Sequence, residues 1–335
     1  MKFLKNLILS KNIKSDINVF IKENFHEKII DNYDEKEDVL FIVDTKLRNF
    51  LKIKNNIKFI KGGEEAKYLD KYLDLCQTIE KNKFNIVIGI GGGSLMDLIG
   101  YTLNTLNHNI KKIILIPTTL TSMIFPPISG FFGIDMNFKR DYLKVFGYVN
   151  EVYIDQSFLS LLSKQSLKKQ FFCSYILGTY FDSNLSKLSL HYSKNFDNTD
   201  LEEFLINSIK NSMKFYKDNY EIPGYNLIKY FIKNPIEINN KFFEIYSSIF
   251  LLLSYISYIE GLISLEEFKM ILNDTNEFGV FNKKIILNMK NNYINDYVTD
   301  IIPGKNKNTL KYFSVNEINI YIDDFINFIR GEKVG

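Results

Sequence analysis

Cysteine is scarce in this chain, because the 335 residues include only Cys76 and Cys173, which lie far apart in the sequence. Two distant cysteines exclude both a disulfide framework and a paired-cysteine metal or redox motif. The first residues interrupt their apolar positions with lysine and asparagine and offer no small-residue cleavage site, so they make a poor signal peptide. We therefore expect a cytoplasmic protein.

Long apolar runs and charge of one sign are also lacking. The longest apolar stretch, residues 245–259, lies between Glu244 and Glu260 and falls short of the ~20 residues that a membrane span needs. The 42 basic and 39 acidic residues are spread along the chain and leave a formal net charge of +3, which gives no concentrated field for nucleic acid or anionic lipid. We predict a buried helix at 245–259, no membrane insertion and no nucleic-acid partner.

Up to about Asp155, short β-branched runs alternate with amphipathic stretches. This alternation is typical of parallel sheets covered by helices. Apolar residues at helical spacing predict a helix over residues 66–81, between two of the strand-like runs. Strands are predicted at residues 38–44, 56–60, 84–90, 111–117 and 151–155.

Beyond Asp155 the β-rich runs stop, and long segments with capping residues and few helix breakers replace them. With 46% hydrophobic residues, the chain is long enough for two packed domains. The fold class that we predict is an α/β domain with a parallel sheet over residues 1–155, followed by an all-α domain over residues 156–335. Helices in the second domain are expected over residues 201–220, 241–259 and 265–277.

A cluster of glycines lies between a buried strand and an amphipathic helix, at Gly91, Gly92 and Gly93. Glycines allow the backbone to turn tightly and to approach a ligand closely. The helix that follows offers unpaired N–H groups and the positive end of its dipole, which suit a pyrophosphate, and Ser94 and Asp97 lie near its start. Because glycine motifs also occur without a ligand, an ordinary strand-to-helix turn is the alternative.

Asp44 follows the first clear strand, a place from which a carboxylate can accept hydrogen bonds from an adenosine ribose. An acidic residue there favours NAD over NADP as the cofactor. Taken alone, Asp44 is also a good helix N-cap or turn residue. Its position relative to the glycine loop favours the dinucleotide interpretation.

Several longer motifs together resemble the 3-dehydroquinate synthase family. They occur in order at residues 61–69 (KGGEEAKYL), 91–105, 116–135, 153–162 and 259–268 (IEGLISLEEF). The wider superfamily includes sugar-phosphate cyclases and the metal-dependent glycerol and alcohol dehydrogenases. The resemblance implies an N-terminal NAD-binding α/β domain, a helical C-terminal domain, a small-molecule ligand such as a phosphorylated sugar, and a homodimer.

The resemblance also implies which residues form an NAD site. The family's GE..K motif, glycine loop and PTT segment line the cofactor, and Arg140 replaces a further family lysine with a side chain of the same charge and a different shape. Together with Asp44, the matching residues are Gly63, Glu64, Lys67, Gly91, Gly92, Gly93, Ser94, Asp97, Thr118, Thr119 and Arg140.

The family's catalytic and metal-binding positions are changed. Phe125 and Phe131 match an aspartate and a lysine that act near the nicotinamide and the substrate. Cys173 matches the metal-ligating glutamate, and residues 223–225 and 242–244 replace the two histidine motifs. Histidine occurs only at positions 26, 108 and 191, so we expect no metal and assign no catalytic residue.

Other polar residues could serve as acid, base or phosphate anchor, although most are interpreted as solvated charges. Glu244 and Asp182 match family acids and are more simply structural. The remaining candidates are Asp135, Lys139, Asp141, Lys144 and Lys229.

Three functions are compatible with this sequence, and it does not decide whether the protein is an enzyme. The first is a sugar-phosphate cyclase with a remodelled site. The second is a metal-independent NAD oxidoreductase, in which Tyr225 or a lysine would activate a hydroxyl. The third is a catalytically silent NAD-binding partner or sensor protein.

Overall fold

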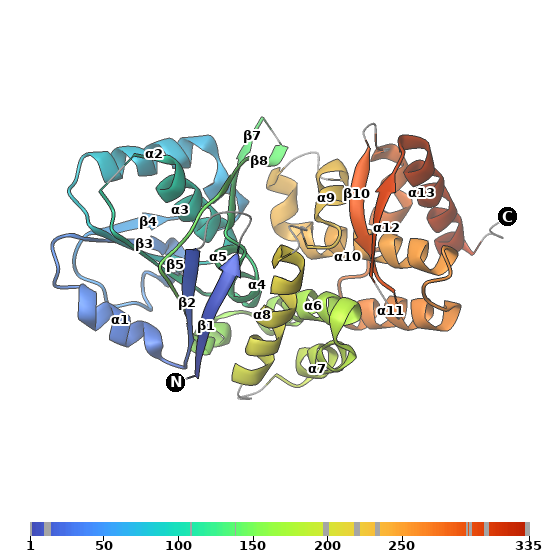
Figure 1. The fold of residues 1–335 in the computed structure, drawn as a ribbon, viewed down its shortest axis with the longest axis horizontal. Helices are drawn as coiled ribbons and strands as arrows, with labels where there is room; N and C mark the ends of the chain where they lie inside the picture. The colour runs from blue at the N-terminus through green and yellow to red at the C-terminus, as the bar shows by residue number, and fades with distance from the viewer. Residues whose placement is uncertain are drawn as a thin grey trace. The chain divides into compact units, whose positions relative to one another are not determined.

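The computed structural model forms two compact units (Figure 1). The first joins Met1–Lys164 to Thr199–Asn219, and the second joins Gln165–Asn198 to Tyr220–Gly335. The structure describes residues 2–9, 15–107, 109–137, 139–196, 201–217, 222–231, 235–292, 294, 297–304 and 308–331.

The first unit is built around a seven-stranded sheet with the order β1-β2-β9-β6-β5-β3-β4. All neighbouring strands pair in parallel, except that β1 is antiparallel to β2. The strands are β1 (Lys2–Leu9), β2 (Ser15–Ile21), β3 (Val39–Asp44), β4 (Ile57–Ile60), β5 (Ile86–Gly91), β6 (Lys112–Pro117) and β9 (Glu151–Ile154).

All five strands predicted from the sequence are present, and the predicted α/β class of this half is confirmed. The central strands β3, β5 and β6 are buried along nearly their whole length, as parallel strands between two layers of helices are. Strands β1 and β2 were not predicted, because their apolar residues are interleaved with lysine, asparagine and aspartate.

Helices and a hairpin complete the first unit. The helices are α1 (Phe25–Tyr33), α2 (Leu69–Glu80), α3 (Gly93–Thr105), α4 (Leu120–Ile124), α5 (Pro126–Ser129) and α8 (Glu202–Lys217), with 3-10 turns at η1 (Thr45–Leu47), η2 (Glu64–Lys67) and η3 (Gln156–Leu161). The hairpin of β7 (Phe131–Met136) and β8 (Lys139–Phe146) packs on α3. Gly100 permits this packing, because a Cβ there would lie 2.2 Å from the ring of Phe132.

The second unit is rich in helices, as predicted. Its elements are α6 (Lys164–Phe181), α7 (Ser183–Lys194), α9 (Tyr225–Phe231), α10 (Pro235–Ile259), α11 (Leu265–Glu277), α12 (Lys283–Leu287), η4 (Met289–Asn292) and α13 (Val315–Arg330). The all-α description needs one correction, because β10 (Val298–Ile302) and β11 (Thr309–Phe313) form an antiparallel hairpin. Each strand is only five residues long, too short to give a clear period in the sequence.

The division into units differs in two respects from the predicted boundary after residue 155, and the first is that the first unit continues to Lys164. Helix α8 was assigned to the second domain, whereas it belongs to the first unit. There it packs against α4 and α5, and the hydroxyl of Ser212 donates a hydrogen bond to the carbonyl of Ile124 (3.1 Å). The sequence pattern marks α8 as a helix but carries no signal for the unit in which it packs.

Helix α10 includes a 19-residue stretch, Lys241–Ile259, that is long and apolar enough to cross a membrane by length and composition. Most of this stretch (67%) is buried inside the protein, and α10 packs against α9, α11, α12, α13 and β10. A core helix passes the same test of length and composition. The buried helix that was predicted for residues 245–259 is therefore confirmed.

Candidate functional site

The glycine loop has the geometry that the sequence indicates. Gly91 ends β5, Gly92 is the N-cap of α3, and Gly93 is the first helical residue. Among the described residues, no side chain caps this helix. The first N–H groups of α3 therefore remain available to a ligand, beside a backbone without Cβ atoms.

The segment after β6 lies against this loop. The Thr118 N–H donates to the carbonyl of Gly91 (2.9 Å), and a Cβ on Gly92 would lie 3.4 Å from the Cγ2 of Thr119. Thr119 also caps α4, because its hydroxyl lies 2.8 Å from that of Ser122 in a capping box. Both predicted threonines are thus beside the glycine loop, and Thr119 has a structural role of its own.

Asp44 lies at the end of β3, next to the same loop. Its carboxylate accepts hydrogen bonds from the N–H groups of Lys46 (3.0 Å) and Gly62 (3.3 Å). A Cβ on Gly91 would lie 3.4 Å from the Cβ of Asp44, so the two residues are neighbours. Asp44 is therefore both the N-cap of η1 and adjacent to the glycine loop, and the two sequence interpretations are compatible.

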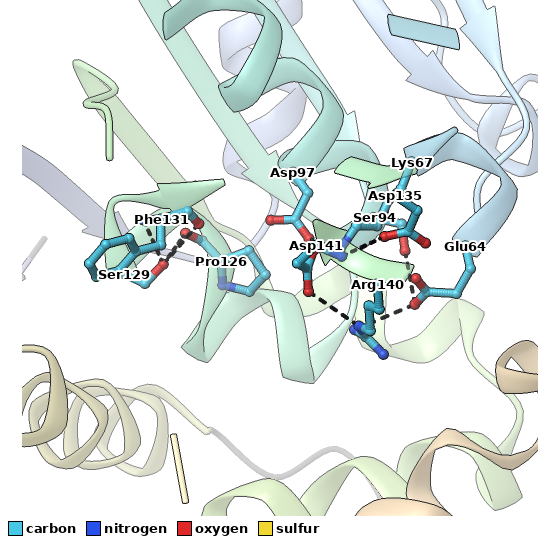
Figure 2. A network of polar contacts seen from close by, with 10 residues as sticks. All are labelled: Glu64, Lys67, Ser94, Asp97, Pro126, Ser129, Phe131, Asp135, Arg140 and Asp141. Carbon is cyan, nitrogen blue, oxygen red and sulfur yellow. Dashed lines mark hydrogen bonds and ion pairs between the residues drawn. The ribbon is translucent and has the colours of Figure 1, made fainter. Parts of the chain in front are cut away.

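A buried network of charged residues connects η2, α3 and β8 (Figure 2). Lys67, in η2, donates from Nζ to the carboxylates of Asp97 on α3 (3.1 Å) and Asp141 on β8. The Lys67 side chain is 1% exposed. It is therefore enclosed by its two carboxylate partners and ties η2, α3 and β8 together.

Arg140 and Glu64 extend this network. Arg140 Nε donates to Asp141 Oδ2 (3.3 Å), and its Nη2 lies 3.6 Å from Glu64 Oε1. Glu64 Oε1 is in turn 3.5 Å from the hydroxyl of Ser94, in the first turn of α3. The sequence-predicted residues Glu64, Lys67, Ser94, Asp97 and Arg140 are thus brought together, although they come from three elements.

Local backbone geometry places the charged residues of the hairpin. Asp141 has a φ of 47°, a left-handed conformation that aspartate tolerates better than most residues. The strand register shifts between Ile134 and Met136, a bulge at Asp135. As a result, Asp135 Oδ1 accepts a hydrogen bond from the Asp141 N–H (2.8 Å).

Burial changes the proton affinities in this network. Burial raises the pKa of Asp97 to about 7, although Lys67 acts in the opposite direction. Burial likewise raises the pKa of Asp135 to about 6. For Lys67, burial alone would lower the pKa, but Asp141 and Asp97 outweigh it and hold the pKa above its usual value. Lys67 is therefore a stable cation, whereas burial raises the pKa of both aspartates.

Asp135 and Asp141 are functional candidates that were named from the sequence without a specific role. Solvated charges were expected, yet Asp135 is 3% exposed and the Asp141 side chain 8%. Asp135 and Asp141 are therefore exceptions to the expectation that most of the polar candidates are solvated charges. Their burial depends on the hairpin folding onto α3, a contact that no local pattern in β7 or β8 encodes.

Phe125 and Phe131 stand at the two positions that match a charged aspartate and lysine of the family. Phe125 is buried between α4 and α5, and Phe131 begins β7 with the amine of Lys144 4.9 Å from its ring centroid. The nearby hydroxyl of Ser129 donates to the carbonyls of Pro126 (2.9 Å) and Phe131 (3.2 Å) (Figure 2). This corner of the unit therefore offers aromatic rings where the family has an aspartate and a lysine.

The residues at the family's metal-binding motifs are used in other ways. Cys173 is buried in α6, and Glu244 pairs with Lys169 (2.6 Å). Within the described part of the chain, no group of three histidine, cysteine, aspartate or glutamate residues could hold a metal ion. Asp182 is the N-cap of α7, where it accepts from the N–H groups of Asn184 and Leu185, as its structural interpretation predicts.

Two of the three histidines lie in the part of the chain that the structure describes. His26 is buried in α1 and lies 2.6 Å from the carboxylate of Asp155, and His191 lies in the last turn of α7. His108 lies outside the described residues, and so does the side chain of Lys229.

Residues 57–169 match the family model described as 3-dehydroquinate synthase N-terminal. The 3-dehydroquinate synthase of Alkaliphilus oremlandii (strain OhILAs) is 26% identical over 162 residues, which are 48% of this chain and 44% of that protein. The chain spans about half the length of the curated relatives that it matches first.

Solved structures match the fold over nearly the whole chain. The 2-epi-5-epi-valiolone synthase of Streptomyces hygroscopicus subsp. jinggangensis 5008, with NAD+ and Zn2+ bound, has a TM-score of 0.75 at 15% identity and covers 93% of this chain and 97% of its own. A 2-deoxy-scyllo-inosose synthase complexed with carbaglucose-6-phosphate, NAD+ and Co2+ has a TM-score of 0.74 at 15% identity and covers 96% and 99%.

The fold of this chain, with an α/β unit and a helix-rich unit, is similar to that of these two synthases. The predicted resemblance to the 3-dehydroquinate synthase family is confirmed, and residues 57–169 are the part of the chain that matches the family model. Both structural relatives contain NAD+, and both also contain a metal ion. The absence of a metal from this chain therefore stays a prediction.

Proposed function

We propose that this protein binds NAD at the glycine loop of its first unit and that its sugar-phosphate cyclase activity is remodelled or lost. One observation carries the proposal: the glycine loop lies beside Asp44, as an NAD site requires, while Phe125 and Phe131 replace the family's catalytic charges. The protein would thus bind the cofactor without carrying out the family's usual reaction.

The loop residues support the cofactor half of this proposal. The uncapped start of α3 presents N–H groups and the positive end of the helix dipole to a pyrophosphate. Asp44 is positioned to accept hydrogen bonds from the hydroxyls of an adenosine ribose. Bound NAD would supply a hydride acceptor at its nicotinamide, while the chain's own contribution is to hold the dinucleotide.

The donor set does not fit a metal ion. Structural and catalytic zinc sites take three or four ligands. Cys173, which matches one family ligand, provides a buried thiol, and Glu244, which lies in the segment that replaces a histidine motif, is held in an ion pair. We therefore derive no step that uses a metal, and we propose that the protein functions without one.

A calorimetric titration with NAD tests the cofactor half. Gly92 has a φ of −79°, and an alanine there would make ordinary contacts with Thr119, so Gly92→Ala fits the folded chain. Its methyl group would nonetheless occupy the space that a phosphate must enter. We expect the wild-type protein to bind NAD and Gly92→Ala to bind at least tenfold more weakly. Thr105→Ala, at the other end of α3, is the control and should bind like wild type.

Elemental analysis and a phosphate-release assay test the chemical half. We expect the purified protein to carry no stoichiometric zinc, cobalt or iron and to release no phosphate from a panel of sugar phosphates. Stoichiometric metal or phosphate release would contradict the proposal. A change in nicotinamide absorbance with simple alcohols would instead assign the metal-independent oxidoreductase.

A further inference from the structure

The carboxylate of Asp44 lies against the backbone of the turn that follows β4. Strands β3 and β4 are parallel neighbours in which Asp44 is paired with Ile60, so the chain leaves β4 beside Asp44. A Cβ added to Gly62, two residues later, would lie 2.8 Å from Asp44 Cγ and nearer still to its Oδ2. Because side-chain carbon atoms do not approach other atoms that closely, any side chain at position 62 would displace the carboxylate.

The backbone conformation of Gly62 does not itself require a glycine. The neighbouring Gly63 has a φ of 102°, a conformation that favours glycine. Gly62 is not among the described residues with a positive φ, so its backbone makes no such demand. The lack of a side chain at position 62 therefore matters for the position of the Asp44 carboxylate.

Backbone N–H groups hold one of the two Asp44 oxygens. Oδ1 accepts hydrogen bonds from Lys46 (3.0 Å), after β3, and from Gly62 (3.3 Å), after β4. Within the described part of the chain, Oδ2 accepts no hydrogen bond and Asp44 forms no ion pair. Lys61, the cation that precedes Gly62, pairs instead with Glu65 (2.9 Å). Oδ2 is therefore held in a fixed orientation and can accept a hydrogen bond from a ligand.

Asp44 lies beside the glycine loop. It ends β3 as Gly91 ends β5, and these strands are parallel neighbours with Val43 opposite Ile90. The two end residues are in contact, because a Cβ on Gly91 would lie 3.4 Å from the Cβ of Asp44. In a dinucleotide-binding sheet, a carboxylate in this place accepts a hydrogen bond from the 2′-hydroxyl of the adenosine ribose. NADP carries a phosphate group on that hydroxyl, which removes the donor and brings negative charge to the carboxylate.

We infer that Gly62 is a positioning residue that holds the Asp44 carboxylate where it selects NAD over NADP. The inference rests on the proposed NAD binding. Gly62 acts in two ways, because its N–H donates to Oδ1 and its missing side chain leaves room for Oδ2. Selectivity between the two dinucleotides is thus assigned to a pair of residues from the ends of two neighbouring strands, and not to the charge of Asp44 alone.

The experiment measures the dissociation constants of NAD+ and of NADP+ by calorimetric titration of the full chain. Gly62→Ala keeps the charge of Asp44 and forces its carboxylate to move, and the displaced atoms are the end of a side chain, so the variant should fold. Asp44→Glu is a second variant, because it also keeps the charge and shifts the carboxylate. Thr105→Ala is the control, and thermal unfolding confirms that each variant is folded.

A double variant shows whether Gly62 acts through Asp44. Asp44→Ala removes the carboxylate, and the double variant adds Gly62→Ala to it. Because the carboxylate that Gly62 positions is then gone, the second substitution should change the ratio of the two dissociation constants less than about twofold.

We expect wild type and Thr105→Ala to bind NAD+ about tenfold more tightly than NADP+, or more, because a hydrogen bond to a charged group is lost in NADP+. In Gly62→Ala and Asp44→Glu this ratio should fall about threefold or more, mainly through weaker binding of NAD+.

Equal affinities for NAD+ and NADP+ in wild type would overturn the inference and leave dinucleotide binding intact. An unchanged ratio in a folded Gly62→Ala protein would also overturn it, and if that protein does not fold, Asp44→Glu decides in the same way. An effect of Gly62→Ala that is as large without the Asp44 carboxylate as with it would contradict the positioning role. If neither dinucleotide binds, the proposed function itself is wrong, and this inference with it.

Discussion

Lys67 illustrates how burial and pairing together set the state of a single side chain. Burial alone would lower its pKa, yet the carboxylates of Asp141 and Asp97 reverse the shift. Removing one partner of such a buried pair leaves an uncompensated charge, which costs more than the pair contributes. Lys67 is therefore a structural residue as well as a predicted cofactor residue, and its replacement would not report on cofactor binding alone.

Asp135 should make the protein less stable as the pH rises. Its pKa is raised from 3.8 to about 6 in the folded protein, so the folded state holds the proton more tightly than the unfolded state does. Stability from this group is present below the unfolded pKa and is lost as the pH rises through the folded pKa. The loss is about 3 kcal/mol, at roughly 1.4 kcal/mol per pKa unit.

We therefore expect Asp135→Asn to be more stable than wild type at pH 8 and to show no such gain at pH 4. Urea unfolding at the two pH values measures the difference in unfolding free energy. A gain of equal size at both pH values would show that the charge of Asp135 is not its cause.

Asp155 is predicted to be a second pH-dependent residue, with the opposite sign. Its buried carboxylate accepts hydrogen bonds from the N–H groups of Asn24, His26 and Ser157 and from the Ser157 hydroxyl, and it pairs with the His26 ring. Burial would raise its pKa, but His26 and Ser157 outweigh burial and lower it. Its contribution is present above the unfolded pKa and is lost as the pH falls through the folded pKa.

Asp155→Ala should lower the unfolding free energy at pH 7 by about 3 kcal/mol, because several buried donors lose their acceptor. Asp74→Ala, which removes only an exposed ion pair with Lys58, should change it by less than about 1 kcal/mol. Chemical denaturation of both variants makes the comparison. Losses of similar size would contradict the structural role given to Asp155.

Helix α3 is the element on which the first unit's candidate site depends. Its start carries the glycine loop, its Asp97 pairs with Lys67, and its Gly100 receives the β7–β8 hairpin. One helix thus fixes the position of the loop relative to the charges on the hairpin. A change at the contact between helix and hairpin is expected to alter both stability and cofactor binding.

Gly100→Ala tests this contact, because its methyl group would overlap the ring of Phe132. Overpacking of this kind costs about 1–3 kcal/mol, and we expect a loss of about 2 kcal/mol in unfolding free energy. The double variant with Phe132→Leu should recover part of the loss. Thermal and chemical unfolding of both variants measure it, and a Gly100→Ala protein as stable as wild type would show that the hairpin does not pack as described.

At the scale of the whole molecule, the proposed function involves one of the two compact units. A ligand that binds only the folded state stabilises it, by about 2.7 kcal/mol at 100 times its dissociation constant. Hydrogen exchange with and without NAD should therefore show added protection at β5 and the start of α3. Added protection confined to the second unit would place the cofactor elsewhere.

The homodimer and the phosphorylated sugar ligand stay predictions.

The sequence by itself determined the elements whose signal is local. Strands β3, β5 and β6 are continuous apolar runs, and the glycine loop and the ordered family motifs need no tertiary contact to be recognised. These patterns were enough to predict the α/β unit, the helix-rich remainder and the residues beside the loop. They also indicated that Phe125 and Phe131 replace charged residues of the family.

Only the tertiary structure decided which charges share one environment. Asp135 and Asp141 are over 30 residues beyond Asp97 in the chain, and their burial arises because Gly100 lets the hairpin approach α3. The same applies to α8, whose periodicity predicts a helix but not the unit in which it packs. Periodicity reports how one segment is buried, whereas burial, pairing and proton affinity depend on the segments that surround it.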